Sequence, residues 1–150
     1  MRVPFACGAP RLATVALVAS ALMVGCLKST DPQPSSLQLA GTWSYTGEQT
    51  GPVRESLAGT LTISGESGTS FQGRLDLVGT NTQTGATRAL TGLVSGAQSG
   101  TVVDFDASLE ATPRRHVGEI KADTISGTWV GDGSGGSMAS GTFRVERESR

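Results

Sequence analysis

From Leu39 onward, apolar and polar residues alternate along eight stretches of the chain. Successive side chains point to opposite faces of a β-strand, so this period of two predicts strands, and no stretch after residue 39 has the spacing of an amphipathic helix. Clusters of Gly, Ser, Asn and Asp separate the stretches, as expected of turns. The predicted strands cover residues 39–46, 57–64, 70–78, 88–95, 101–109, 115–122, 124–130 and 138–147.

A short unit with a central glycine recurs in nearly all of these strands. An apolar or bulky residue is followed two positions later by Gly, and an apolar residue stands two positions after that, as in Leu57-x-Gly59-x-Leu61 and Ile125-x-Gly127-x-Trp129. The period of two places each glycine on the inward face, where a missing side chain lets a strand bend sharply. The opposite face is predicted to be solvated; it carries Thr60, Thr62, Gln72, Arg74, Asp76, Asp104, Asp106, Glu119, Lys121, Thr142, Arg144 and Glu146.

The strand pattern predicts an all-β domain, a small eight-stranded antiparallel up-and-down β-barrel, in which closure removes the free sheet edges. A β-sandwich of the same strands is the alternative, and no helical domain is expected after the N-terminal segment. The connections 47–56, 79–86, 110–114 and 131–137 are mostly longer than those between the other strands. The barrel should therefore have a long-loop rim and a short-loop rim.

The N-terminal segment has the features of a targeting signal. Arg2 and Arg11 precede an uncharged run over residues 12–24, which is too short to cross a bilayer as a helix. The run ends in Leu22-Met-Val-Gly-Cys26, which resembles the lipobox of bacterial lipoproteins, with Met where Leu is usual. The resemblance implies cleavage before Cys26 and acyl chains on that cysteine that anchor the protein in a membrane. An ordinary secretory signal is the alternative.

The predicted organisation has three parts. Residues 1–25 form a lipoprotein signal peptide, residues 26–38 the lipidated cysteine and a flexible tether, and residues 39–150 the barrel domain. Because Leu27 rather than Asp follows Cys26, the lipoprotein resemblance implies the outer membrane, facing the periplasm, in preference to the inner membrane. The tether joins the first strand at the short-loop rim, so the long-loop mouth is expected to face away from the membrane.

Charge and cysteine content exclude several classes of function. Removal of residues 1–25 takes away Arg2 and Arg11 and no acid, so the formal net charge changes from -1 to -3. No basic face for nucleic acid is expected. No cysteine follows Cys26, so the domain has no disulfide and no Cys-ligated metal site. Neither a cofactor nor a bound metal is predicted.

The candidate catalytic chemistry is sparse. His116 is the only histidine, and no Gly-x-Ser-x-Gly elbow accompanies it, so we expect a packed or rim histidine and no enzymatic activity. Arg114, in a predicted loop, and Arg115, at the start of the next predicted strand, lie at the mouth, where they could hold an anionic group, but solvation is the preferred interpretation of both. The acids Asp104, Asp106, Glu110 and Glu119 are likewise interpreted as part of a solvated face rather than as a Ca²⁺ site or a glycosidase pair.

The first predicted strand contains Leu39-Ala-Gly41-Thr-Trp43, which resembles the Gly-x-Trp opening of the calycins, the superfamily of lipocalins, fatty-acid-binding proteins and avidins. Arg144 or Arg147 on the last strand would match the Arg that packs over that Trp in many calycins. The resemblance implies a small or apolar ligand inside the barrel. With only two tryptophans, the chain departs from the avidins, and biotin binding is not expected.

The predicted function is that of a lipid-anchored cell-envelope lipoprotein whose non-enzymatic, lipocalin-like barrel binds a small or apolar ligand. The alternative is a structural or interaction lipoprotein with a filled barrel, in which Trp43 and Trp129 serve only in core packing. An enzyme ranks third. The predicted ligand-binding residues are Trp43, Tyr45, Leu61, Leu75, Phe105 and Trp129.

Overall fold

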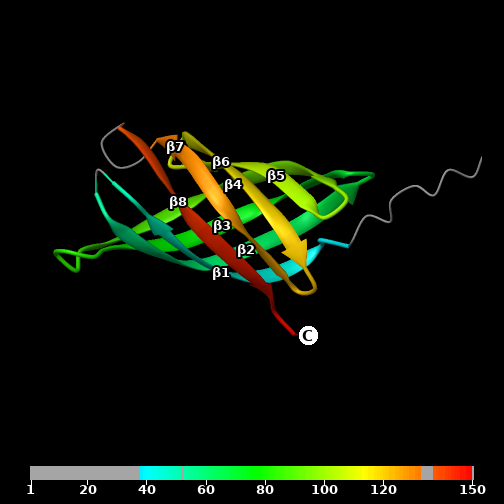
Figure 1. Ribbon diagram of the computed structural model, residues 1–150, viewed down its shortest axis with the longest axis horizontal. Helices are drawn as coiled ribbons and strands as arrows, with labels where there is room; N and C mark the ends of the chain where they lie inside the picture. Colours follow the sequence, from blue (N-terminus) through cyan, green and yellow to red (C-terminus); the bar gives the residue numbers. More distant parts are fainter. Residues whose placement is uncertain (1–37, 52, 133–136, 150) are drawn as a thin grey trace, which may run out of the picture. The chain divides into compact units, whose positions relative to one another are not determined.

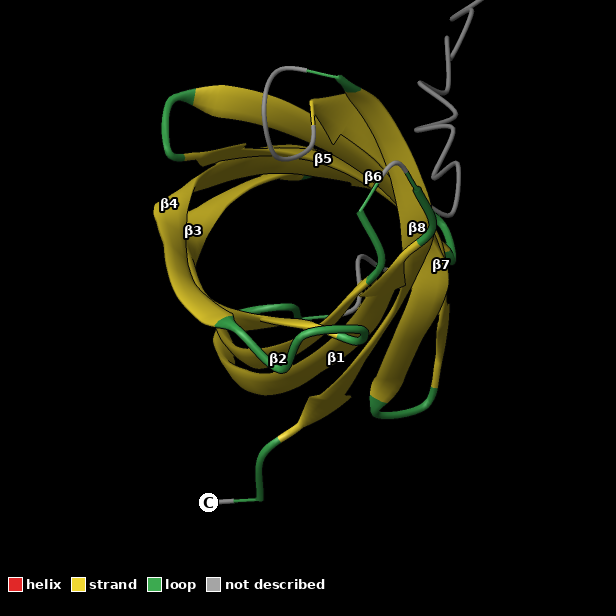
Figure 2. Cartoon of the chain, turned by 90° about the vertical axis from the view of Figure 1, so that its left-hand side faces the viewer, coloured by secondary structure: helices red, strands yellow, loops and turns green. Residues whose placement is uncertain are grey.

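The computed structural model describes residues 38–51, 53–132 and 137–149, which form antiparallel β-strands joined in chain order (Figure 1). The strands are β1 (Gly41–Gln49), β2 (Glu55–Ser67), β3 (Ser70–Asn81), β4 (Thr87–Ser99), β5 (Val102–Leu109), β6 (Thr112–Lys121), β7 (Thr124–Asp132) and β8 (Met138–Arg147). Each strand pairs with its neighbour in the chain, and β8 pairs with β1. The strands thus form a closed ring (Figure 2), which confirms the predicted barrel and excludes the sandwich.

Residues 1–37 lie outside the described residues. They include the predicted signal peptide, Cys26 and all of the predicted tether except residue 38. Within the described part of the chain, no helix is long and apolar enough to cross a membrane.

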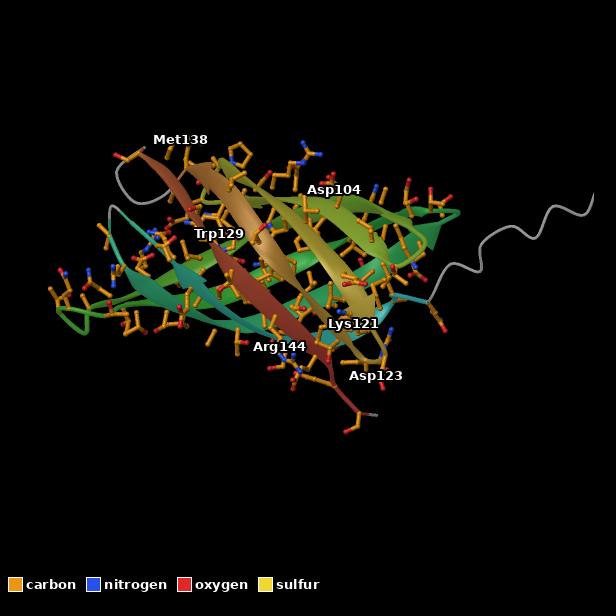
Figure 3. All side chains as sticks on the ribbon, viewed as in Figure 1. Asp104, Lys121, Asp123, Trp129, Met138 and Arg144 are labelled. Atoms are coloured by element: carbon orange, nitrogen blue, oxygen red, sulfur yellow. The ribbon has the colours of Figure 1, made fainter. Side chains whose placement is uncertain are left out.

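The predicted alternation of faces is confirmed along the strands. In β3, buried and exposed residues alternate without interruption from Ser70 to Gly79. The outward face carries polar side chains, Arg144 among them (Figure 3), and ion pairs such as Arg74–Asp76, at 2.8 Å, and Arg144–Glu146, at 2.7 Å. These exposed pairs contribute little to stability, so burial of the inward apolar side chains is the main stabilising force.

The recurring glycines lie where a neighbouring strand comes too close for a side chain. A Cβ atom added to Gly59 would lie 2.0 Å from the carbonyl oxygen of Asp76, and one on Gly73 would lie 2.2 Å from that of Thr62. The backbone of the adjacent strand therefore occupies the volume that a side chain would need. Glycine at these positions lets the sheet coil tightly enough to close.

The end of the barrel at the short-loop rim is held together by Trp43 and Arg147. The indole Nε1 of Trp43 donates to the carbonyl oxygen of Leu39 at 2.9 Å, and Nη1 of Arg147 donates to that of Ala40 at 3.0 Å. The guanidinium of Arg147 lies 4.2 Å from the centre of the Trp43 ring. Arg147, rather than Arg144, thus has the position that the calycin resemblance implies, because Arg144 points outward to Glu146.

The connections of the long-loop rim span residues 50–54, 82–86, 110–111 and 133–137. The prediction of a longer loop over 110–114 is wrong, because Glu110 and Ala111 alone make the turn, with φ values of 50° and 66°. Two central residues with positive φ are typical of the type I′ turn, whose twist matches that of the flanking strands. Strand β6 consequently begins at Thr112, and Arg114 belongs to a strand.

Candidate functional site

The interior of the barrel carries polar side chains near its long-loop end. Gln49 and Glu55 flank the β1–β2 connection, and Arg114 and His116 lie near the start of β6. All four are buried, with exposed fractions between 1% and 5%. Burying charged groups is costly unless they are paired, so these residues mark the candidate site. We call Gln49, Glu55, Arg88, Arg114 and Trp129 the mouth cluster.

Glu55 and Arg88 form the ion pair of the mouth cluster. Nε and Nη2 of Arg88 donate to the two carboxylate oxygens of Glu55 at 2.9 and 2.7 Å. Nη1 of Arg88 also lies 3.2 Å from Oε2 of Glu110 at the rim. These contacts raise the pKa of Arg88, chiefly through the hydrogen bonds to Glu55. Arg88 therefore stays charged and satisfies both oxygens of Glu55.

Arg114 differs from Arg88 in that much of its guanidinium group lacks hydrogen-bond partners among the described residues. The side chain is 2% exposed and lies over the ring of Trp129, 4.8 Å from its centre. In the described ranges, neither its Nε nor its Nη1 has a hydrogen-bond partner. Burial, and then the positive charge of Arg88, lower the pKa of Arg114, while Tyr45, Glu55 and Glu110 act in the opposite direction.

The interpretation of Arg114 as a solvated loop residue is thus wrong. The two-residue turn starts β6 early enough for the period of two to place Arg114 on the inward face with His116, and Arg115 on the outward face. Arg115 is exposed and donates through Nε to Asp104 at 3.0 Å, as a solvated residue would. The signal in the sequence was the position of Arg114 two residues before the inward His116.

His116 is packed in the interior, as predicted, and both ring nitrogens are engaged. Its Nδ1 lies 3.0 Å from the carbonyl oxygen of Arg114, which can only accept, so Nδ1 carries the proton. Nε2 then accepts from the hydroxyl of Tyr45 at 3.3 Å. Burial lowers the pKa of His116 to about 4 and raises the pKa of Tyr45, so both groups are neutral at neutral pH.

Neither a family model nor a curated protein matches this chain. The solved structure of EF1p2_mFAP2b bound to DFHBI is similar over 73% of this chain and 94% of that one, with 14% identity and a TM-score of 0.60. The redesigned beta barrel b11L5F_LGL has 16% identity and a TM-score of 0.54, over 74% and 92% of the two chains. The bradavidin2–biotin complex has 20% identity and a TM-score of 0.51, over 75% and 100%.

This chain shares with them the fold of a closed antiparallel β-barrel. At these identities the similarity concerns the fold alone. In this barrel, the predicted ligand-binding side chains all lie in the interior and are between 0% and 2% exposed; they are Trp43, Tyr45, Leu61, Leu75, Phe105 and Trp129. Their role as ligand contacts stays a prediction.

The sheet register of the barrel groups five of the six predicted residues into two rows. Leu61 lies between Trp43 and Leu75 in the register of β1, β2 and β3. Across the barrel, His116 lies between Phe105 and Trp129 in the register of β5, β6 and β7. The ring of His116 stacks on that of Phe105, with centres 4.5 Å apart. The second row ends at Trp129 and joins the mouth cluster.

The two tryptophans of the barrel differ in their hydrogen bonds. Trp43 donates to Leu39, whereas Nε1 of Trp129 and Oε1 of Gln49 have no partner among the residues that the structure describes. A pocket of about 250 Å³ opens beside this end of the barrel, lined by Glu48, Gln49, Thr50, Arg54, Glu55, Ser56 and Thr82. Two residues of the mouth cluster thus form part of its wall. The described residues contain no group of three side chains suited to hold a metal ion.

Proposed function

We propose that this protein is a non-enzymatic, lipid-anchored lipoprotein of the cell envelope whose barrel binds a small ligand at its long-loop mouth. The observation that carries the proposal is a set of buried polar atoms at that end that have no hydrogen-bond partner among the described residues, namely Nε and Nη1 of Arg114, Nε1 of Trp129 and Oε1 of Gln49. A buried polar group without a partner costs about 1–3 kcal/mol. A ligand that supplies the missing partners would recover that free energy.

The size of the barrel and its structural neighbours support this proposal. An eight-stranded barrel is wide enough for side chains or one small ligand. Two of the neighbouring structures are complexes, one with DFHBI and one with biotin, so barrels of this fold accommodate small molecules. In this chain the ligand would meet aromatic and aliphatic side chains of the interior, including the predicted contacts Tyr45, Phe105 and Trp129.

The anchoring part of the proposal rests on the sequence around Cys26. Lipid on Cys26 would attach the tether to the membrane, and β1, which follows the tether, begins at the short-loop rim. The long-loop mouth would then face away from the membrane and be open to a ligand from solution. For a protein with Leu27 after the cysteine, we propose the outer membrane, facing the periplasm, in preference to the inner membrane.

We also propose that the protein is not an enzyme. Both ring nitrogens of His116 are engaged, by the Arg114 carbonyl and the Tyr45 hydroxyl, so the ring is not poised to take a proton from a substrate. Its pKa, lowered to about 4, makes it a weak base at neutral pH.

Native mass spectrometry of the full protein, purified from the membranes of its own host, tests ligand binding. A stoichiometric small molecule that changes the tryptophan emission of the emptied protein on readdition is the expected result. A bare polypeptide, with no response to a panel of lipids and metabolites, would contradict the proposal. It would favour a structural or interaction lipoprotein with a filled barrel.

The intact mass from the same preparation tests the anchor independently. We expect a polypeptide that begins at Cys26 and carries a diacylglycerol and an acyl group. A mass that begins at another residue, or one without lipid, would exclude the lipoprotein assignment and leave ligand binding untouched.

A further inference from the structure

We propose that Arg114 binds an anionic oxygen group, a carboxylate or a phosphate, on the ligand of this barrel. The inference rests on the proposed function and specifies the class of ligand. Arginine suits such groups because its guanidinium offers several fixed N–H donors. Two of its three nitrogen atoms, Nε and Nη1, are buried and lack partners within the described chain.

The acids near Arg114 are already engaged by Arg88. Both oxygens of Glu55 accept hydrogen bonds from Arg88, and Glu110 also pairs with Arg88. No carboxylate of the described residues lies within ion-pair distance of Arg114, although Glu55 and Glu110 act on it electrostatically. An anion from outside would supply the close partner that Arg114 lacks.

The other groups that face Arg114 cannot replace that anion. His116 and Tyr45 are neutral, and their hydrogen bonds are directed to the Arg114 carbonyl and to each other. Trp129 offers its ring face to the guanidinium, and a cation–π contact supplies no hydrogen-bond acceptor. Nε1 of Trp129 is a further donor without a partner, so the site has an excess of donors.

Apolar side chains near the mouth cluster suit the body of such a ligand. A Cβ atom added to Gly79 would lie 3.4 Å from Cδ2 of Leu57, 3.5 Å from Cδ1 of Leu90 and 3.5 Å from Oε2 of Glu55. The two leucines and Glu55 thus converge on one small glycine. An apolar body on the ligand would contact such side chains, so the expected ligand is a compact molecule with an apolar body and one anionic oxygen group.

Equilibrium dialysis of the full protein in a non-ionic detergent, with a detergent blank, tests the inference. The probes share a naphthalene body: naphthalene-2-acetate carries a carboxylate, 2-naphthyl phosphate a phosphate, and 2-(2-naphthyl)ethanol no charge. We expect at least one anionic probe to bind about tenfold more tightly than the alcohol. The stronger of the two anions identifies whether the natural group is a carboxylate or a phosphate.

Arg114→Met is the decisive variant, and Arg115→Met is its control on the outward face of the same strand. Arg114→Met should weaken the anionic probe about tenfold and leave the alcohol within about twofold. Its melting temperature should be unchanged or higher, because the substitution removes a buried charge that lacks a close partner. Arg115→Met should change no affinity.

The possible failures are distinguishable. Equal binding of acid and alcohol, unaffected by Arg114→Met, would overturn the anion inference and leave ligand binding intact. Absence of binding for every probe would overturn the inference for this ligand class, and together with a bare native mass it would overturn the proposed function. An unfolded Arg114→Met would assign a structural role to the guanidinium and contradict the proposal; Arg114→Lys, which keeps the charge, should retain part of the preference for the anion.

Discussion

The guanidinium of Arg147 lies 4.2 Å from the centre of the Trp43 ring, at the opposite end of the barrel from Arg114 and Trp129. The register of β1 and β8 pairs Arg147 directly with Trp43. Arg147 also donates to the carbonyl oxygens of Ala40 and Gln38, so it ties the chain before β1 to the last strand. The two Arg–Trp pairs thus differ: Arg147 has hydrogen-bond acceptors, whereas Nε and Nη1 of Arg114 have none among the described residues.

Replacement of Arg147 tests the stabilising role of this pair. Arg147→Met should lower the free energy of unfolding by about 2 kcal/mol, because it removes the cation–π contact and the hydrogen bonds to the chain before β1. Arg144→Met, which removes an exposed arginine of the same strand, should cost less than about 0.5 kcal/mol. Urea unfolding followed by tryptophan emission measures both, and equal effects would contradict this role.

The stability of the barrel should depend on pH through His116. Its pKa is lowered from 6.5 to about 4 in the folded state, so the unfolded chain takes up a proton first as the pH falls. The free energy of unfolding should be highest above pH 6.5 and decrease by about 3 kcal/mol down to pH 4. Urea unfolding at a series of pH values measures the slope.

The control for this pH dependence is His116→Gln, which does not titrate but keeps a donor and an acceptor. His116 is the only histidine of the chain, so the slope between pH 6.5 and about 5 should largely vanish in this variant. The slope near pH 4 should partly remain, because carboxylates titrate there. An unchanged slope over the whole range would show that His116 is not the responsible group.

A side chain at Gly59 should strongly destabilise the barrel. In Gly59→Ala the new Cβ would lie 2.0 Å from the carbonyl oxygen of Asp76, so strands β2 and β3 would have to move apart. We expect a loss of about 3 kcal/mol. Gly65→Ala is the matched control in the same strand, because no atom lies within 4 Å of its added Cβ; its thermal unfolding should be nearly unchanged.

The turn between β5 and β6 offers a stabilising change. Ala111 has a φ of 66°, a conformation that costs a residue with a Cβ about 1 kcal/mol and costs glycine little. Ala111→Gly should therefore raise the free energy of unfolding by about 0.5 kcal/mol, after allowance for the greater freedom of glycine in the unfolded chain. Ala107→Gly, within β5, should have the opposite sign. A loss of stability in both variants would contradict the turn geometry.

His116 and Arg114 show how far the interior could be predicted from the sequence. The position of His116 within an alternating stretch was enough to predict a packed or rim histidine. Arg114 lies two residues before His116 and therefore on the same face, but the predicted strand began at residue 115 and left Arg114 in a loop. The length of the turn before it decides whether Arg114 lies in a loop or in the strand. The two central residues of that turn, Glu110 and Ala111, are neither Gly nor Asn, the residues that usually indicate a type I′ turn.

The alternation of apolar and polar residues by itself determined the all-β class, the number of strands and the face to which each side chain belongs, because the period of two is a local property of an extended chain. The same alternation predicted that the recurring glycines belong to the inward face. Only the tertiary structure decided that β8 pairs with β1 and that Arg147 rather than Arg144 covers Trp43. These outcomes depend on register and closure, which bring together residues far apart in the chain and leave no local pattern in the sequence.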